Sequence, residues 1–218
     1  MTYEKIKKDQ GINTYITHAD AALGVLGYTE HSFAHVTKVA QTAGQLLETL
    51  HYPQRMVELA KIAGYMHDIG NVINRSEHSQ SGAVMAFRLL DKMGFDPEEI
   101  AVIVSAIGNH DEGTGVPVSA VAAALILADK SDVRRSRVRS KQIDTFDIHD
   151  RVNYSVTHAQ LDINAEQTQV TLKLTVDTQF SPVMDYFEIF MSRMILCRKA
   201  AKALNLEFKL MINEQSML

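Results

Sequence analysis

Apolar residues recur every three or four positions through most of the first 132 residues. Ile12, Ile16 and Ala19 start this pattern, which places them on one face of an α-helix. Asp96 followed by Pro97 is typical of a helix start, because Asp caps the first free N–H groups and Pro has no N–H to leave unpaired there. The spacing predicts about six helices, over residues 12–26, 32–50, 54–69, 82–93, 96–107 and 119–132.

The periodicity changes after residue 150. Leu161 and Ile163 alternate with polar residues, as do the apolar positions of 170–176, and the polar residues 164–167 favour a turn between them. Helical spacing and then alternation return, which predicts a helix over 184–204 and a strand over 206–212. We therefore expect a mainly α chain, with a helical bundle in residues 1–150 and a small C-terminal α+β unit of ββαβ order in residues 151–218.

Composition and charge narrow the classes of protein. Acidic residues outnumber basic ones, 26 to 22, so the chain has no overall positive field to hold nucleic acid, and nucleic acid is not an expected partner. The longest apolar run, Ala120 to Ala128, has nine residues, whereas a membrane-spanning helix needs roughly 20. The single cysteine, Cys197, cannot form an internal disulfide, and the first ten residues contain no export signal. We expect a soluble, cytoplasmic protein without a membrane partner.

Histidine and aspartate residues lie at the inward ends of several predicted helical faces. His67 directly precedes Asp68 on the apolar stripe of the third helix, and Asp129 ends the most apolar segment. Neighbouring side chains on a helix diverge by about 100°, so His67 and Asp68 converge on one ion only where the helix unwinds, which Gly70 would permit by ending it. Three further histidines on or next to other predicted helices complete the set: His35, His78 and His110.

Imidazole and carboxylate ligands together suit a borderline divalent ion such as Fe, Mn, Zn, Co or Ni. The lack of a nearby cysteine argues against a structural zinc site. Taken singly, each residue has another explanation, since a histidine on an apolar face can be a hydrogen-bonded core residue and Asp129 can pair with Arg134 or Arg135. The coincidence of several such positions favours a metal site.

The order of these residues resembles the HD-domain superfamily of metal-dependent phosphohydrolases over about residues 31–132. The family pattern is a His, a later His-Asp doublet and a final Asp, and it matches this chain in the segments AGYMHDIGN and ILADKSD. Members with two metals add two histidines, to which those in HSQSGA and IGNHDEGTG are similar. The resemblance implies an HD-type bundle holding one or two divalent ions, Mg included, with Asp68 as a bridge and these ligands: His35, His67, Asp68, His78, His110 and Asp129.

Three polar residues depart from this pattern or compete with it. The cyclic-dinucleotide branch of the family has a Lys after the HD-Ile-Gly core and a His-His doublet downstream, where this chain has Asn71 and Asp111, so that branch is disfavoured. His31 competes with His35 as the first ligand, and the spacing to the following Val-Ala favours His35. We expect His31, Asn71 and Asp111 at the rim of the site.

A basic segment follows Asp129 directly. Residues 130–141 contain six Lys or Arg and one acid, a local charge of +5. Arginine grips phosphate oxygens in bidentate fashion, so a phosphate clamp is expected. The alternative is a solvated loop, or one paired with acids such as those of 144–150. The residues expected to bind the substrate are Lys130, Arg134, Arg135 and Arg137.

These residues predict a metal-dependent phosphohydrolase that cleaves a phosphate ester or anhydride of a nucleotide or another small phosphorylated metabolite. Asp68 and Lys130 are the expected catalytic residues. A second interpretation is a di-iron oxygenase of the same fold, because that branch uses a similar ligand set. A third is a nucleotide sensor without catalysis, whose ββαβ unit contacts a partner or forms a homodimer.

Overall fold

The computed structural model describes residues 2–217, in which eight helices precede a small sheet and a ninth lies between its second and third strands. The helices are α1 (Tyr3–Lys7), α2 (Gln10–Val25), α3 (Phe33–Thr49), α4 (Gln54–Met66), α5 (His78–Lys92), α6 (Pro97–Gly108), α7 (Ala120–Ser131), α8 (Ile148–Ser155) and α9 (Val183–Ala203). Short 3₁₀ turns occur at Ile69–Val72, Arg135–Arg137 and Ile143–Thr145. The strands are β1 (Val156–Ile163), β2 (Gln169–Val176), β3 (Glu207–Ile212) and β4 (Gln215–Ser216).

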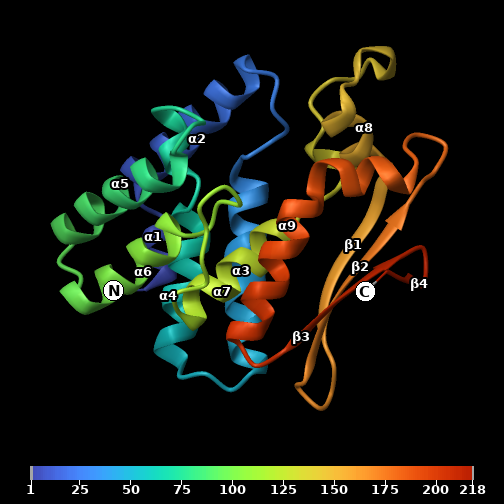
Figure 1. Cartoon of the computed structure of the whole chain (residues 1–218). Coiled ribbons are helices and arrows are strands. Elements are labelled where there is room, and N and C mark those ends of the chain that lie inside the picture. Colours follow the sequence, from blue (N-terminus) through green and yellow to red (C-terminus); the bar gives the residue numbers. More distant parts are fainter. Residues whose placement is uncertain (1, 218) are drawn as a thin grey trace.

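The sheet lies beside the helical bundle, and α9 lies between the two (Figure 1). Its strand order is β1-β2-β3-β4, with β2 and β3 parallel and the two outer pairs antiparallel. Leu172 at the centre of β2 faces Leu161 of β1 on one side and Leu210 of β3 on the other. The prediction of a mainly α chain with a small C-terminal α+β unit is confirmed.

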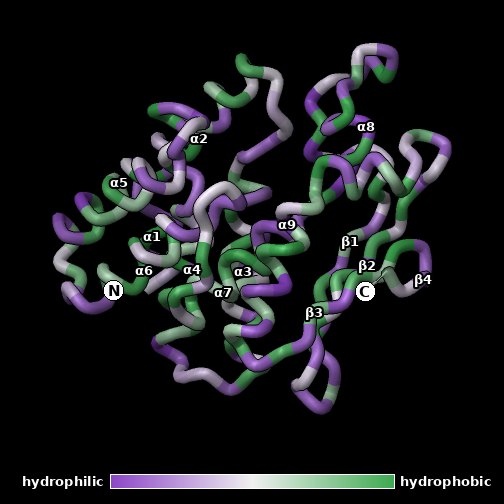
Figure 2. Tube along the Cα trace, viewed as in Figure 1, coloured by the Kyte–Doolittle hydropathy of each residue, from purple (hydrophilic) through white to green (hydrophobic). Residues whose placement is uncertain are grey.

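One hydrophobic core connects the bundle to the sheet. Val39 of α3, Leu125 of α7, Met194 of α9 and Leu172 of β2 all belong to one cluster of buried residues. Hydrophobic positions gather where α3, α4 and α7 meet, while hydrophilic positions dominate the loops (Figure 2). The division into two domains at residue 150 stays a prediction. Among residues 2–217, no helix is both long and apolar enough to cross a bilayer.

Helix starts follow the sequence signals closely. Asp96 caps α6, where its Oδ1 accepts a hydrogen bond of 2.9 Å from the backbone N–H of Glu98, and Pro97 takes the first helical position. Ser119 caps α7 in the same way by accepting from the N–H of Ala122. Both helices therefore begin within one residue of the predicted start.

Other element ends differ from the prediction. The third predicted helix ends at Met66, not at residue 69, because the chain passes into a 3₁₀ turn. Gly70 does not end α4: a Cβ there would lie 2.0 Å from the carbonyl oxygen of His78, so this glycine is required by close packing against α5. The apolar spacing did not predict α1, α8 and β4, because these short segments have few periodic positions. It predicted only the C-terminal part of β1.

Candidate metal centre

His35 enters the centre from the first turn of α3. Ser32 caps this helix, and the third helical residue, His35, is fully buried. Its Nδ1 donates a hydrogen bond of 2.8 Å to Oδ2 of Asp132. The opposite ring nitrogen, Nε2, lies 3.4 Å from Oδ1 of Asp129 and 3.6 Å from Oδ2 of Asp68.

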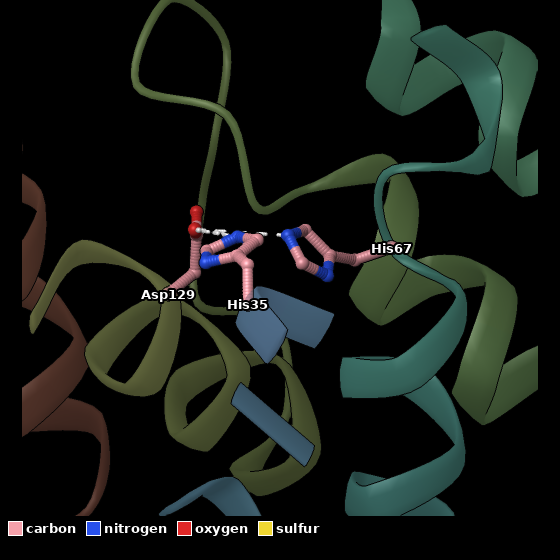
Figure 3. Close-up of side chains that lie close together, drawn as sticks. All are labelled: His35, His67 and Asp129. Atoms are coloured by element: carbon pink, nitrogen blue, oxygen red, sulfur yellow. Dashed lines mark ion pairs between the residues drawn. The ribbon is translucent and has the colours of Figure 1, made fainter. Parts of the chain in front are cut away.

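His67 and Asp68 follow the last residue of α4. Because the α-helix ends at Met66, the two consecutive side chains turn toward one point, and His67 Nε2 lies 3.2 Å from Asp68 Oδ2. The same nitrogen lies 3.6 Å from Oδ1 of Asp129, which projects from the C-terminal part of α7. Figure 3 shows the imidazoles of His35 and His67 directed at the Asp129 carboxylate.

The histidines share one arrangement that leaves Nε2 available. Nδ1 donates to the carbonyl oxygen of Gly64 in His67, of Ile107 in His110 and of Arg75 in His78, at 2.8, 2.6 and 3.1 Å. A histidine whose Nδ1 carries the proton presents a lone pair at Nε2, as metal-binding histidines do. Two of these Nε2 atoms, those of His35 and His67, are buried without a hydrogen-bond partner among residues 2–217. Buried polar atoms without a partner are rare in proteins, and these two nitrogens fit a cation-binding site.

Asp68 faces two groups of ligands with its two oxygens. Oδ2 lies near His35 and His67, whereas Oδ1 lies 3.5 Å from Nε2 of His78. Nε2 of His78 lies in turn 3.2 Å from Nε2 of His110. The candidate ligands form two groups, and within each group the ligand atoms all lie within 4.8 Å of one another. One group is His35, His67 and Asp129, and the other is His67, Asp68 and His110.

The centre contains room for a small ion. A cavity of about 20 Å³ lies among these side chains, and roughly 10–15 Å³ is enough for one water-sized particle. Its lining includes Asp68, His78, His110 and Asp129. The donor set of imidazole nitrogens and carboxylate oxygens matches a divalent transition metal. The residues present therefore fit a bound metal ion.

The charges at the centre shift its pKa values. Burial by itself raises the pKa of Asp68, but the adjacent His67 holds it well below its usual range. Burial also raises the pKa of Asp129, and Lys130 beside it brings the pKa well below the usual range. Burial lowers the pKa of His67, but Asp68 and Asp129 outweigh this and raise it to about 10, so a cation that binds at Nε2 displaces the proton held there. Burial and His67 hold the pKa of His110 well below its usual range. The carboxylates are thus ionised and ready to bind a cation.

The three rim residues lie beside the centre in different ways. His31 stacks edge-on against His35 with ring centroids 5.3 Å apart and is not part of either ligand group, so the geometry favours His35 over His31 as the candidate first ligand. Asn71 donates from Nδ2 to Oδ1 of Asp68 at 2.9 Å. Asp111 is more distant, with Oδ1 4.0 Å from Nε2 of His78.

The side chains of the basic segment do not gather in one place. Arg137 and Lys130 line the small cavity, but Arg134 pairs with Asp132 and Arg135 lies over the ring of Tyr154 at 4.4 Å. Neither Arg134 nor Arg135 lines this cavity or the larger one beside it, so their expected role in substrate binding is not supported by their positions. Arg134 pairs with Glu30 and Asp132, and Arg135 pairs with Asp177, which the local charge of the sequence could not reveal.

Lys130 is buried and paired with two carboxylates. Its Nζ lies 2.8 Å from Oδ2 of Asp129 and 2.6 Å from Oε2 of Glu112. Burial lowers its pKa, but these two acids outweigh burial and raise it, so Lys130 stays charged. Asp129 thus pairs with Lys130 and not with Arg134 or Arg135, the alternative that the sequence left open.

Three site residues escaped the sequence patterns: Arg75, Glu112 and Arg193. Arg75 Nη1 lies 3.3 Å from Nε2 of His78, and Arg193 approaches from α9. Both arginines line the small cavity and a neighbouring cavity of about 500 Å³. Glu112 lines the larger one and accepts a hydrogen bond from Arg193. No local spacing marks these residues, since they belong to loops or to a helix distant in sequence.

Comparison with known proteins identifies the family. Residues 32–151, which are 120 of the 218 residues, match the profile described as HD domain. The chain therefore belongs to the HD domain family. The matched region contains every residue of the two ligand groups.

Two relatives and one solved structure show how far the similarity reaches. The chain is 26% identical to the uncharacterized protein MJ1020 of Methanocaldococcus jannaschii over 64% of its own length and 62% of that protein. It is 28% identical to ribonuclease Y of Enterococcus faecalis over 55% of its own length and 21% of that protein. A predicted HD superfamily hydrolase from an uncultured Thermotogales bacterium aligns with a TM-score of 0.47 and 23% identity, over 60% of this chain and 73% of that one. The chain thus spans less than two thirds of both relatives.

Proposed function

We propose that this protein is a metal-dependent phosphohydrolase acting on a small phosphorylated metabolite, with a nucleotide as the first candidate. The observation that carries the proposal is the pair of buried Nε2 atoms of His35 and His67, which have no hydrogen-bond partner in the described part of the chain and are aimed at the carboxylates of Asp68 and Asp129. Membership of the HD domain family and the arginines around the cavity support it.

His35, His67 and Asp129 would hold one divalent ion, and His78 and His110 a second, with Asp68 between them. A bound ion of this kind lowers the pKa of a coordinated water and offsets negative charge on a phosphoryl group. The identity of the ion is part of the proposal: Fe, Mn, Zn, Co, Ni and Mg all accept ligands of these types, with Mg favouring oxygen.

The remaining residues of the site orient the ligands and bind the substrate. Lys130 offsets the charge of Asp129 and holds its Oδ2, so that Oδ1 faces the histidines. This is a positioning role, in place of the catalytic role expected for Lys130 from the sequence. Asn71 holds Oδ1 of Asp68 by its side-chain amide. Arg75 and Arg137 line the cavity and offer positive charge to phosphate oxygens.

The larger cavity suits a compact organic group. Its volume of about 500 Å³ lies in the range of small-molecule sites, roughly 300–1,000 Å³. Tyr28 and Phe190 contribute aromatic rings to its lining, while Asp147 and Asn153 contribute polar groups. A phosphomonoester with an aromatic base or a similar ring would place its phosphate at the metal centre and its organic group in this cavity.

The arginines also separate this proposal from the di-iron oxygenase. Four basic residues line the small cavity, and three of them, Arg75, Arg137 and Arg193, also line the larger cavity. A ring of guanidinium groups between a metal centre and a substrate cavity favours an anionic substrate. Phosphate chemistry accounts for these charges more directly than oxidation does.

The test combines metal analysis with a substrate panel. Protein purified without chelator is analysed for metals and then assayed for phosphate release with monoesters, diesters and anhydrides, each with Mn, Mg, Fe, Co, Ni and Zn. Asp68→Ala is expected to lose bound metal and turnover together. His158→Ala, a change at an exposed histidine of β1, is the matched control and is expected to retain both. Turnover of Asp68→Ala at the wild-type rate would contradict the proposal, as would the absence of any metal-dependent phosphate release by the wild-type protein.

A further inference from the structure

The C-terminal helix α9 contributes a side chain to the metal centre. Residues beyond 151 lie outside the segment that matches the HD domain family, yet Arg193 of α9 lines the small cavity together with Asp68 and Asp129. Arg193 also lines the larger cavity. It therefore lies at the boundary between the proposed metal ions and the proposed substrate, where a phosphate group would lie.

Arg193 is held from two sides. Its Nε donates a hydrogen bond of 2.9 Å to Oε1 of Glu112, in the loop between α6 and α7. Its guanidinium carbon lies 4.3 Å from the centre of the Phe190 ring, one turn earlier on α9. The side chain is 22% exposed, so most of it is fixed while part of it remains open to the cavity. These contacts orient the guanidinium before any substrate binds.

The end of the guanidinium remains available. An arginine has five N–H donors, and among residues 2–217 the hydrogen bonds of Arg193 involve Nε alone. The two terminal nitrogens thus have no hydrogen-bond partner within the described part of the chain. Arg137 differs, since its Nε donates to the carbonyl of Glu30 and its Nη1 to the carbonyl of Asp132. Hydrogen bonds to two loop carbonyls thus occupy most of the Arg137 guanidinium. Arg193 instead keeps both terminal nitrogens, whose planar arrangement matches two phosphate oxygens.

A chain of charges connects Arg193 to a proposed metal ligand. Asp129 pairs with Lys130, Lys130 with Glu112, and Glu112 with Arg193, at 2.8, 2.6 and 2.9 Å. The two cations and two carboxylates alternate, so each charge has an opposite neighbour. This arrangement fixes the distance between the arginine and the metal centre, and burial does not abolish its charge: the pKa of Arg193 is raised because Glu112 and Asp129 outweigh the effect of burial.

We propose that Arg193 binds the phosphate group of the substrate through its two terminal nitrogens, and that Glu112 positions it. The proposal rests on the proposed function, because it assigns the phosphate of that reaction to a residue of the C-terminal unit. It gives α9 a direct role in the site. Without α9, the cavity would lack the one arginine whose fork is free among the residues described.

The first experiment measures phosphate binding and not turnover. Inorganic phosphate is titrated by calorimetry into metal-loaded wild-type protein, Arg193→Gln and Arg198→Gln. Arg198 lies on the same helix, is exposed and lines neither cavity, which makes it the matched control. We expect the affinity of Arg193→Gln for phosphate to fall about tenfold or more, the usual effect of losing a charged hydrogen-bonding partner, with unchanged metal content. Arg198→Gln is expected to match the wild type.

Two further variants keep the test decisive. Arg193→Lys retains a charge but not the planar fork, and we expect weaker phosphate binding than in the wild type and stronger binding than in Arg193→Gln. If Arg193→Gln does not fold, as judged by its melting temperature, the phosphate affinity of Arg193→Lys tests the proposal in its place. Glu112→Gln keeps the size of the side chain and removes its charge; it is expected to raise KM more than it lowers kcat, because it loosens the arginine and leaves the metal ligands in place.

The outcomes distinguish the two proposals. Phosphate affinity equal to wild type in both Arg193→Gln and Arg193→Lys, in an enzyme that releases phosphate, would overturn the role of Arg193 and leave the phosphohydrolase standing. Failure of metal-loaded wild-type protein to bind inorganic phosphate at millimolar concentration would also overturn it. Phosphate binding that depends on Arg193, in a protein that hydrolyses no phosphate compound, would support the phosphate site while contradicting the proposed reaction.

Discussion

The imidazole of His35 is held by Asp132, a residue 97 positions away in the sequence, through a hydrogen bond of 2.8 Å. Asp132 directly follows α7, the helix that carries Asp129. The same helix end thus supplies one candidate ligand and orients another. Asp132 is buried, and Lys38 and Arg134 pair with its other oxygen at 3.0 Å each.

Replacing Asp132 by asparagine is expected to weaken metal binding. The neutral amide is a poorer acceptor for the His35 N–H, and loss of such a partner to a metal-binding histidine typically costs about 10–100-fold in affinity. Competition with a chromogenic chelator measures this affinity. Asp144→Asn, at an exposed carboxylate of the Ile143–Thr145 turn, is the control. Equal metal affinities for the two variants would contradict the positioning role of Asp132.

Removal of metal is expected to lower the melting temperature. A ligand that binds only the folded protein stabilises it by RT ln(1 + [L]/Kd), about 2.7 kcal/mol at a hundred times Kd. Among residues 2–217, the buried Nε2 atoms of His35 and His67 have no hydrogen-bond partner, and a bound ion would serve as their partner. The measurement is thermal unfolding before and after EDTA treatment and after return of the metal. Asp68→Ala should melt at one temperature under all three conditions, and a shift equal to that of wild type would show that the metal acts elsewhere.

A side chain at Gly70 is expected to destabilise the protein and the site together. An added Cβ would lie 2.0 Å from the carbonyl oxygen of His78 and 2.5 Å from the amide nitrogen of Gly82, so α5 must move. Overpacking of this kind costs about 1–3 kcal/mol, and it displaces a candidate ligand as well. Chemical denaturation and metal analysis of Gly70→Ala test this. In the control, Gly108→Ala, the nearest contact is an ordinary 3.6 Å to Ala83, and stability should change little.

Cys197 is expected to resist thiol reagents in the folded protein. Burial raises its pKa to about 12, so at pH 8 the side chain is almost wholly the unreactive thiol. The unfolded chain loses this proton near its ordinary value of 9.0, so this group makes folding less favourable as the pH rises from about 9 toward 12 and has no effect below that range. The rate of modification by a chromogenic disulfide reagent, with and without denaturant, is the measurement. Rapid modification of Cys197 in the native protein would contradict the prediction that the folded protein protects this thiol.

Much of the fold could be predicted from local patterns. The caps Asp96 and Ser119 marked helix starts because a capping side chain acts within three residues. The candidate ligands were also accessible, because each lies at the inward end of an apolar stripe and their order resembles the HD-domain superfamily. The structure brings them together, and their roles stay predictions until metal is measured.

The rest of the site depends on contacts that no local pattern encodes. Arg134 and Arg135 looked like phosphate ligands because their neighbours in sequence are basic, yet they pair with residues from distant segments. Arg193 lay outside any recognised motif and reaches the centre only because α9 packs between the sheet and α7. Charge in a sequence shows how many cations are present but not which of them face a cavity.

The two oxygens of Asp68, each turned toward a different set of histidines, have a consequence for how ions bind. If two ions bind there, Asp68 would share its single negative charge between them, so the first ion would lower the affinity for the second. Occupancy of the two proposed positions would then be linked, and a titration of metal-free protein should resolve into a tight and a weaker equilibrium instead of two independent ones.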